Sequence, residues 1–124
     1  MTEFEKDTLT EKIIACCFAV HTKIGPGFPE RIYHNALIVM CGENNLKWES
    51  EKIFEVYFHK KKIGTFKCDL VIDEKVIVEL KSVTGFMPVL FRNQVIAYLK
   101  ASKIKTGLLV NFGNKSCEVK RISV

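Results

Sequence analysis

The hydrophobic pattern of the chain begins with helical spacing. In Thr8–Ile24, apolar residues recur at close to helical spacing, and Thr8 followed by Glu11 fits a capping box at a helix start. The Gly25-Pro26-Gly27 sequence predicts the end of this helix. A second helix is predicted from Pro29 to about Gly42, with a buried face formed by Ile32, Ala36, Leu37 and Met40.

From Lys47 onward the pattern changes to short β-branched and aromatic runs that are typical of strands. The predicted strands and the one helix between them are Ile53–Phe58, Ile63–Ile72, Val76–Lys81, the helix Val89–Ser102, Thr106–Phe112 and Cys117–Ile122. A helix that links two neighbouring strands forms a crossover connection. The order therefore predicts one parallel strand pair in an otherwise antiparallel sheet.

Three charged residues stand where the central strands are otherwise apolar: Asp69, Glu79 and Lys81. Glu79 and Lys81 are two residues apart on a strand, so both side chains point to one face of the sheet. Leu80 then points to the other face, into the core. A buried carboxylate is costly unless it is paired or binds a metal. These charges are therefore candidates for a functional site.

The loop between the two strands decides whether Asp69 lies opposite Glu79. If Asp73–Lys75 forms a three-residue loop, Ile72 pairs with Val76, and Asp69 faces Glu79 with Cβ atoms about 5 Å apart. A two-residue turn places Asp69 opposite a neighbour of Glu79, and a bulge is then needed to restore the pair. The sequence leaves both registers open.

Two facing carboxylates raise the pKa of one of them unless a cation intervenes. Oxygen ligands favour Mg²⁺ or Mn²⁺, which activate water and neutralise charge on a phosphate. In this interpretation Lys81 orients the water or neutralises the phosphate. An ion pair of Lys81 with Glu79 or Asp69 on a solvated sheet face explains the same spacing, and the spacing alone does not distinguish the two.

Composition narrows the class of protein. The 124 residues, 48% hydrophobic and 27% charged, suit one globular domain spanning 1–124. The net charge of +5 favours a polyanionic partner. The five cysteines are odd in number and show no CxxC spacing, which argues against disulfides and cysteine-ligated metal and favours a reducing cytoplasm. No signal peptide or membrane span is expected.

Three blocks of residues resemble the PD-(D/E)xK nuclease superfamily, and within it the small GxxExxY family. They are the segment Gly27–Tyr33; Asp69 with Val76–Lys81; and Gln94 and Tyr98–Lys100 followed by Gly107–Gly113. The resemblance runs from about residue 13 to residue 122. It implies a restriction-endonuclease-like αβββαβ core, an α/β fold of the α+β kind. In such a fold a mixed central sheet is flanked by helices, here with an extra N-terminal helix.

The resemblance also implies roles for individual residues. Metal binding falls to Glu30, Asp69, Glu79 and the carbonyl oxygen of Leu80, with Mg²⁺ or Mn²⁺ as the cofactor. Lys81 completes the catalytic signature. Gln94 and Tyr98 match a motif of RecB-type and lambda-exonuclease-type members, and their i,i+4 spacing puts both on one helix face.

These observations predict a metal-dependent nuclease that hydrolyses phosphodiesters of nucleic acid, with DNA favoured over RNA as the substrate. Two alternatives are a binding or accessory module that keeps the fold without cutting, and a Holliday-junction-resolvase-like dimer. A homodimer or a partner protein is also expected because a short chain has little surface for substrate selection. If the nuclease interpretation holds, Glu30, Asp69, Glu79, Lys81 and Gln94 should converge in one pocket.

Other residues carry weaker expectations. Tyr33 either bonds into the site or is a buried amphipathic side chain. His21, His34 and His59 lack metal-ligand spacing, and polar surface positions are predicted for all three. For Lys60–Lys62 at the hairpin tip, a solvated turn is the simpler interpretation and contact with a nucleic-acid backbone is the alternative.

Overall fold

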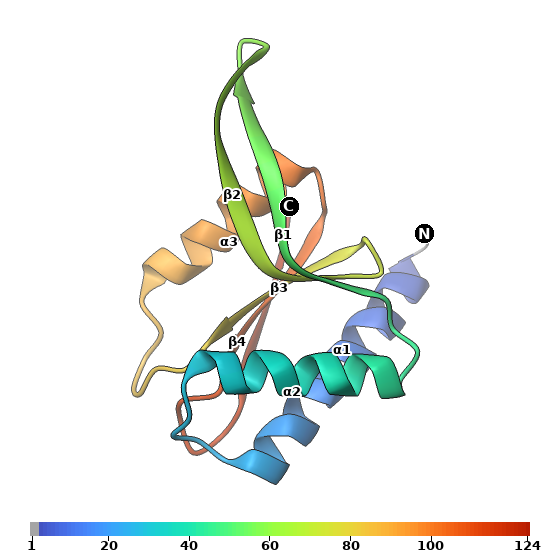
Figure 1. The fold of residues 1–124 in the computed structure, drawn as a ribbon, viewed down its shortest axis with the longest axis vertical. Helices are drawn as coiled ribbons and strands as arrows, with labels where there is room; N and C mark the ends of the chain where they lie inside the picture. Colours follow the sequence, from blue (N-terminus) through green and yellow to red (C-terminus); the bar gives the residue numbers. More distant parts are fainter. Residues whose placement is uncertain (1–2) are drawn as a thin grey trace.

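The computed structural model describes residues 3–124, with side chains from residue 8 onward. Three helices and five strands follow one another along the chain (Figure 1). Their bounds are α1 Glu3–Ile24, α2 Glu30–Glu43, β1 Trp48–Phe58, β2 Lys61–Ile72, β3 Val76–Lys81, α3 Val89–Ser102, β4 Thr106–Asn111 and β5 Glu118–Ser123. No helix within these residues is long and apolar enough to cross a membrane.

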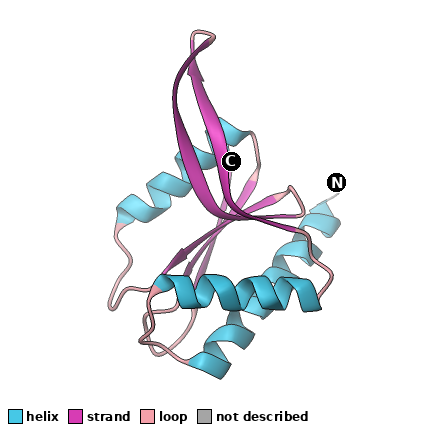
Figure 2. Ribbon diagram, viewed as in Figure 1, coloured by secondary structure: helices cyan, strands magenta, loops and turns pink. Residues whose placement is uncertain are grey.

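The strands form one sheet in the order β1-β2-β3-β4-β5 (Figure 2). Only β3 and β4 run parallel, joined by the α3 crossover, while the other neighbouring pairs are antiparallel. The predicted mixed sheet with one parallel pair is therefore confirmed. The strand bounds differ mainly at β1, which begins at Trp48 rather than at Ile53.

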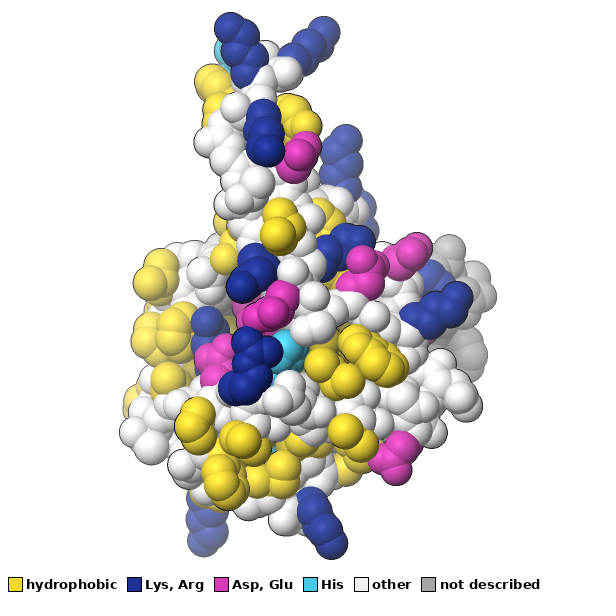
Figure 3. Space-filling view, viewed as in Figure 1, with side chains coloured by type: hydrophobic (Ala, Val, Ile, Leu, Met, Phe, Trp, Pro, Cys, Tyr) yellow, Lys and Arg dark blue, Asp and Glu magenta, His cyan; other side chains and the backbone are white. Residues whose placement is uncertain are grey.

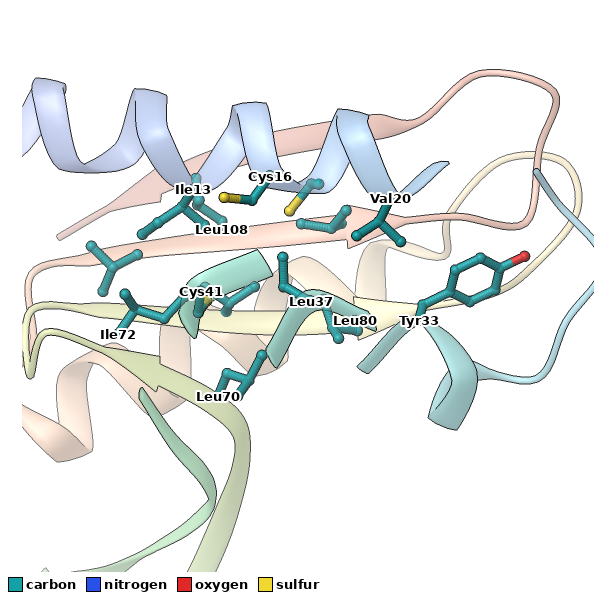
Figure 4. Packing of buried hydrophobic residues seen from close by; sticks show 14 of the residues in the cluster. Ile13, Cys16, Val20, Tyr33, Leu37, Cys41, Leu70, Ile72, Leu80 and Leu108 are labelled. Carbon is teal, nitrogen blue, oxygen red and sulfur yellow. The ribbon is translucent and has the colours of Figure 1, made fainter. Parts of the chain in front are cut away.

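Helices cover both faces of the sheet. On one face α1 and α2 contribute Ile13 and Leu37 to a core cluster that also contains Leu80 (Figure 4). On the other face α3 packs Val95 and Leu99 against strand residues in a second cluster. Because Leu80 lies in the first cluster, its neighbours Glu79 and Lys81 on β3 point to the α3 face, as strand alternation predicts.

The helix predictions need two corrections. Helix α1 already begins at Glu3, so Thr8 lies inside the helix and is not its N-cap. In α2 the buried face is Tyr33, His34, Leu37 and Cys41, while Ile32 is 41% exposed. The prediction of Ile32 as an inward residue was wrong by one position, because the helix face that begins at Tyr33 is the one that packs against the sheet.

Tyr33 fastens the turn between α1 and α2. Its hydroxyl donates to the carbonyl oxygen of Gly25 at 2.7 Å and accepts from the backbone N–H of Phe28 at 3.2 Å. Its ring stacks on Phe112, with centroids 4.6 Å apart. Gly25 and Gly27 have φ values of 77° and 111°, which glycine adopts readily. Tyr33 is thus the buried amphipathic side chain of the two alternatives.

Two of the three histidines are not on the surface. His21 and His34 are buried, so the prediction of polar surface positions was wrong for both. The Nε2 atom of His21 lies 2.9 Å from the carbonyl oxygen of Asn114, which is a bond within the fold. His59 is exposed, as predicted.

Candidate active site

The antiparallel pairing of β2 and β3 ends where Asp69 and Glu79 meet. Ile72 pairs with Val76, and the ladder continues to Leu70 and Val78. This is the register of the three-residue loop, and its next pair is Asp69 with Glu79. There, carboxylates take the place of backbone carbonyls. The N–H of Asp69 donates to Oε1 of Glu79 at 3.0 Å, and the N–H of Leu80 donates to Oδ2 of Asp69 at 2.8 Å.

Burial and the neighbouring acid keep a proton on this pair. The pKa of Glu79 is raised from 4.5 to about 8, first by burial and then by the charge of Asp69. The backbone bond from Asp69 lowers this pKa, a hydrogen bond between the two carboxyl groups raises it, and the Lys81 ammonium lowers it. At neutral pH a proton therefore holds together two groups that otherwise repel each other.

Glu30 joins the pair from the other side of the sheet, in the first turn of α2. Burial and the charge of Asp69 raise the pKa of Glu30, while Lys81 and Arg31 lower it. Glu30 and Asp69 also line the same cavity, which places the first turn of α2 beside Asp69. The helix N-terminus favours a negative charge at this position.

Lys81 lies two residues beyond Glu79, at the end of β3. Its Nζ atom is 4.3 Å from the centroid of the Phe91 ring, in the first turn of α3. A cation over an aromatic face is stabilised by the ring quadrupole. Phe91 thus supports the ammonium group beside the acidic pair.

Gln94 and Tyr98 approach the same region from α3. The pKa of Tyr98 is raised, first by burial and then by the charges of Glu79, Cys68 and Asp69, while a side-chain hydrogen bond from Gln94 lowers it. The Tyr98 ring stacks on Phe66 of β2 at 4.4 Å. The hydrogen bond between the two side chains agrees with their i,i+4 spacing on one face of α3, and Tyr98 lies close enough to Glu79 and Asp69 to sense their charges.

A cavity of about 230 Å³ opens beside the acidic pair, lined by Glu30, Arg31, His34, Glu51 and Asp69. Acidic, basic and histidine side chains gather at the centre of this face of the molecule (Figure 3). Glu79, Lys81 and Gln94 do not line this cavity. Of the five side chains expected in one pocket, this cavity therefore contains only those of Glu30 and Asp69.

Sequence reasoning missed His34 as part of the site. Arg31 donates to Nδ1 of His34 at 3.0 Å, so the ring proton sits on Nε2 and donates to the carbonyl oxygen of Asp69 at 3.1 Å. Ser50 Oγ also lies 3.2 Å from Nε2. The one available signal was position, since His34 follows Glu30 by one helical turn.

Arg31 extends this network to Glu51, with an ion pair of 2.8 Å. Glu51 has a φ of 53°, a left-handed conformation that is uncommon outside glycine and asparagine. It interrupts the β1–β2 ladder opposite Asp69, where no residue pair is formed. The backbone on both sides of Asp69 is therefore held by contacts outside the sheet ladder.

Asn111 is a second residue whose role the sequence did not reveal. It is fully buried at the end of β4. Its Oδ1 accepts from the N–H groups of Val83 and Gly113 at 2.9 and 3.0 Å, and its Nδ2 donates to the Val83 carbonyl at 2.9 Å. Asn111 thus fixes the segment that follows Lys81. A lone amide inside an apolar strand was the available signal.

The chemistry of the donor set fits a hard divalent cation. The candidate ligands are carboxylate oxygens and a backbone carbonyl, which suit Mg²⁺ and Mn²⁺, and Mg²⁺ commonly keeps waters with one or two carboxylates. Among the side chains from residue 8 onward, no three histidine, cysteine or acidic groups are already gathered in metal-binding geometry. The raised pKa of Glu79 beside Asp69 marks where a cation would take the place of a proton.

Comparisons with known proteins agree with this geometry. No curated protein matches the chain. A solved structure described as "Crystal structure of SSO0001" matches with a TM-score of 0.60 and 22% identity. The match covers 75% of this chain and 48% of that one, so this chain spans about half of its length and the likeness concerns the fold. The family model of the PD-(D/E)XK nuclease superfamily matches residues 7–122, and the chain belongs to this superfamily.

Proposed function

We propose that this protein is a metal-dependent nuclease that hydrolyses phosphodiester bonds of nucleic acid, with DNA as its substrate. The observation that carries the proposal is the meeting of Asp69 and Glu79 at the point where the β2–β3 ladder ends. A buried Glu79 beside a half-buried Asp69 costs stability unless the pair has a function, because burial disfavours the charged form. Membership of a nuclease superfamily agrees with this assignment.

In this proposal Glu30, Asp69, Glu79 and the Leu80 carbonyl hold Mg²⁺ or Mn²⁺. The chemistry that such an ion supplies when bound is activation of a water molecule and stabilisation of charge on a phosphate oxygen. Asp69 is the shared element of the set, because it is coupled electrostatically to both Glu30 and Glu79. Its backbone is fixed by His34 on the α2 side.

Lys81 positions the attacking water or the phosphate. It lies on the same face of β3 as Glu79, and its charge lowers the pKa of both Glu30 and Glu79. The Phe91 ring covers one side of the ammonium group and limits its hydration there. Such an ammonium can donate hydrogen bonds to water or to phosphate oxygens.

Gln94 and Tyr98 support the substrate or the acidic ligands from α3. Their mutual hydrogen bond and the stacking of Tyr98 on Phe66 fix both side chains. The net charge of +5 suits a polyanionic substrate. All five cysteines are free and buried, which supports the cytoplasm as the compartment of action.

The test is a cleavage assay with purified protein, Mg²⁺ or Mn²⁺, and single-stranded, duplex and branched DNA and RNA. We expect cleavage by the wild type and a loss of at least about 100-fold in Glu79→Gln and Lys81→Met, the size typical for a removed charge-stabilising group. The exposed residues Glu43 and Lys100 provide the matched controls Glu43→Gln and Lys100→Met. Cleavage that persists in Glu79→Gln refutes the assignment. Metal-independent binding without cleavage indicates a binding module instead.

A further inference from the structure

The β1–β2 hairpin extends well beyond the rest of the molecule as a two-stranded arm (Figure 1). The outer half of the arm has no helix packed on it in either ribbon view, whereas its base is supported by the ring stack of Phe54, Phe66 and Tyr98. Tyr57, Phe58 and Ile63 near the tip are each about three-fifths exposed: 58%, 62% and 64%. An arm of this kind adds little to the core, so its length calls for another explanation.

The tip of the arm is strongly basic. His59, Lys60, Lys61 and Lys62 follow one another, all exposed, and basic side chains crown the arm in Figure 3. Lys62 forms an ion pair with Glu55 at 3.4 Å. Among the ion pairs of the described residues, Lys60 and Lys61 take part in none. Their charges are therefore available to a ligand.

The turn at the tip is built from residues that disfavour its backbone. Phe58 pairs with Lys61, so His59 and Lys60 form a two-residue loop. Their φ values are 48° and 65°, and both lie in the left-handed region that this type of turn requires. Asn-Gly is the favoured pair for such a loop. Charged residues in this strained position point to a function at the surface.

The arm and the candidate active site are one continuous strand. Asp69 follows Lys61 by eight positions along β2, which corresponds to about 26 Å at about 3.3 Å per residue. This is less than one turn of a DNA duplex, about 34 Å. The major groove, about 12 Å wide, admits a two-stranded β-ribbon. A duplex held at the acidic pair is thus within reach of the tip.

Charge complementarity indicates which partner binds the tip of the arm. A second copy of this chain carries a net charge of +5 and opposes a basic tip. A DNA duplex carries two negative charges per base pair and matches it, and the nearby aromatic side chains can contact sugars and bases. We propose that the β1–β2 hairpin is a DNA-binding arm whose tip lysines contact duplex phosphates away from the cleaved bond. The placement of the cleaved bond rests on the proposed nuclease function.

The test compares two charge-matched double variants of the full chain. Lys60→Glu with Lys61→Glu changes the tip, and Lys12→Glu with Lys23→Glu changes exposed lysines of α1 by the same net charge. Fluorescence anisotropy measures binding to a duplex of about three helical turns, without divalent metal, over a range of salt concentrations. We expect weaker binding for the tip variant only, with a slope of log K against log salt reduced by about 1.8, from about 0.9 per lost phosphate contact.

A second tip variant separates charge from folding. His59→Asn with Lys60→Gly installs the favoured turn pair and removes charge. We expect a melting temperature at least as high as that of the wild type, with weaker DNA binding. If this variant and the Lys60→Glu/Lys61→Glu variant both bind like the wild type, the arm proposal is overturned.

Two further results overturn the arm proposal. One is equal loss of binding in the α1 variant, which shows an effect of net charge alone. The other is a change of solution mass in the tip variants without loss of DNA binding, which shows an interface between copies. The experiment also distinguishes failure of the proposed nuclease function from failure of the arm proposal. In that case the wild type does not cleave, yet its metal-free binding still depends on the tip lysines.

Discussion

The pKa of Glu79, raised from 4.5 to about 8, is the residue-scale feature from which most of the candidate chemistry follows. It is raised because burial and Asp69 both disfavour a second negative charge. The same environment that holds a proton at neutral pH gives a divalent cation two oxygens to bind once the proton leaves. In the proposed function, metal binding at Glu79 would therefore release a proton.

The raised pKa of Glu79 predicts how the stability of the metal-free protein changes with pH. Because the pKa of Glu79 is raised from 4.5 to about 8, the folded protein binds this proton more tightly than the unfolded chain does. The stabilisation is fully present below the ordinary pKa and is lost as pH rises through about 8. We expect the metal-free melting temperature to fall between about pH 5 and pH 9, and Glu79→Gln to flatten this part of the profile.

Calorimetry provides the companion measurement. At neutral pH, Mn²⁺ binding should release protons, detected as a dependence of the apparent enthalpy on the ionisation enthalpy of the buffer. Glu79→Gln should abolish the part of the release that comes from this residue. A wild-type melting temperature that does not change over the same pH range contradicts the assignment of the proton to Glu79.

His34 provides a second residue-scale prediction. Its Nε2–H is a donor to the buried carbonyl of Asp69, so His34→Ala leaves that carbonyl short of a partner. We expect a loss of about 1–3 kcal/mol in the free energy of unfolding, measured by urea denaturation. Mn²⁺ affinity should fall as well, because Asp69 loses support. Asn35→Ala, at an exposed position of the same helix, is the control and should change neither quantity.

At the scale of elements, the segment after β3 decides where Lys81 is held. Asn111 bonds to both backbone groups of Val83, and Gly113 packs directly against the same residue. A Cβ atom at Gly113 would lie 2.2 Å from the Val83 carbonyl oxygen. The end of β4 therefore fixes the position of the segment that follows Lys81.

Gly113→Ala tests this contact between the end of β4 and Val83. The new methyl group meets backbone atoms that cannot move away cheaply, so we expect a destabilisation of about 1–3 kcal/mol or more. Thermal denaturation measures the effect. Gly64→Ala is the control, since a Cβ atom there has no neighbour within 4 Å and Gly64 is not among the glycines with positive φ. Equal melting temperatures for the two variants would show that Gly113 is not a close contact.

At the scale of the whole molecule, local pattern and crossover topology predict the sheet well. The helix at Val89–Ser102 and the strand at Val76–Lys81 have the predicted bounds, because both are flanked by strong turn or proline signals. The opposition of Asp69 and Glu79 required one unknown, the loop length, and the structure supplies it. Strand alternation then placed Glu79 and Lys81 on one face without further information.

What the sequence could not predict depends on long-range packing. The burial of His34 and its bond to Asp69 join α2 to β2, 35 residues apart, and no local pattern encodes that contact. The outward position of Ile32 follows from the rotation of α2 on the sheet. The hairpin arm is also longer than the sequence predicted. Alternation of apolar and polar residues reports packing on a core, and the outer half of the arm has no core to pack against.

The most direct test of the central claim is a crystal of the protein soaked with Mn²⁺ and measured for anomalous scattering. We expect a peak in contact with a carboxylate oxygen of Asp69 and one of Glu79, with the hydrogen bond between the two carboxyl groups replaced. Glu79→Gln, soaked in the same way, should show a weakened or absent peak. At saturating Mn²⁺, wild-type crystals without a peak at this pair, with both backbone-to-carboxylate bonds intact, would contradict the account.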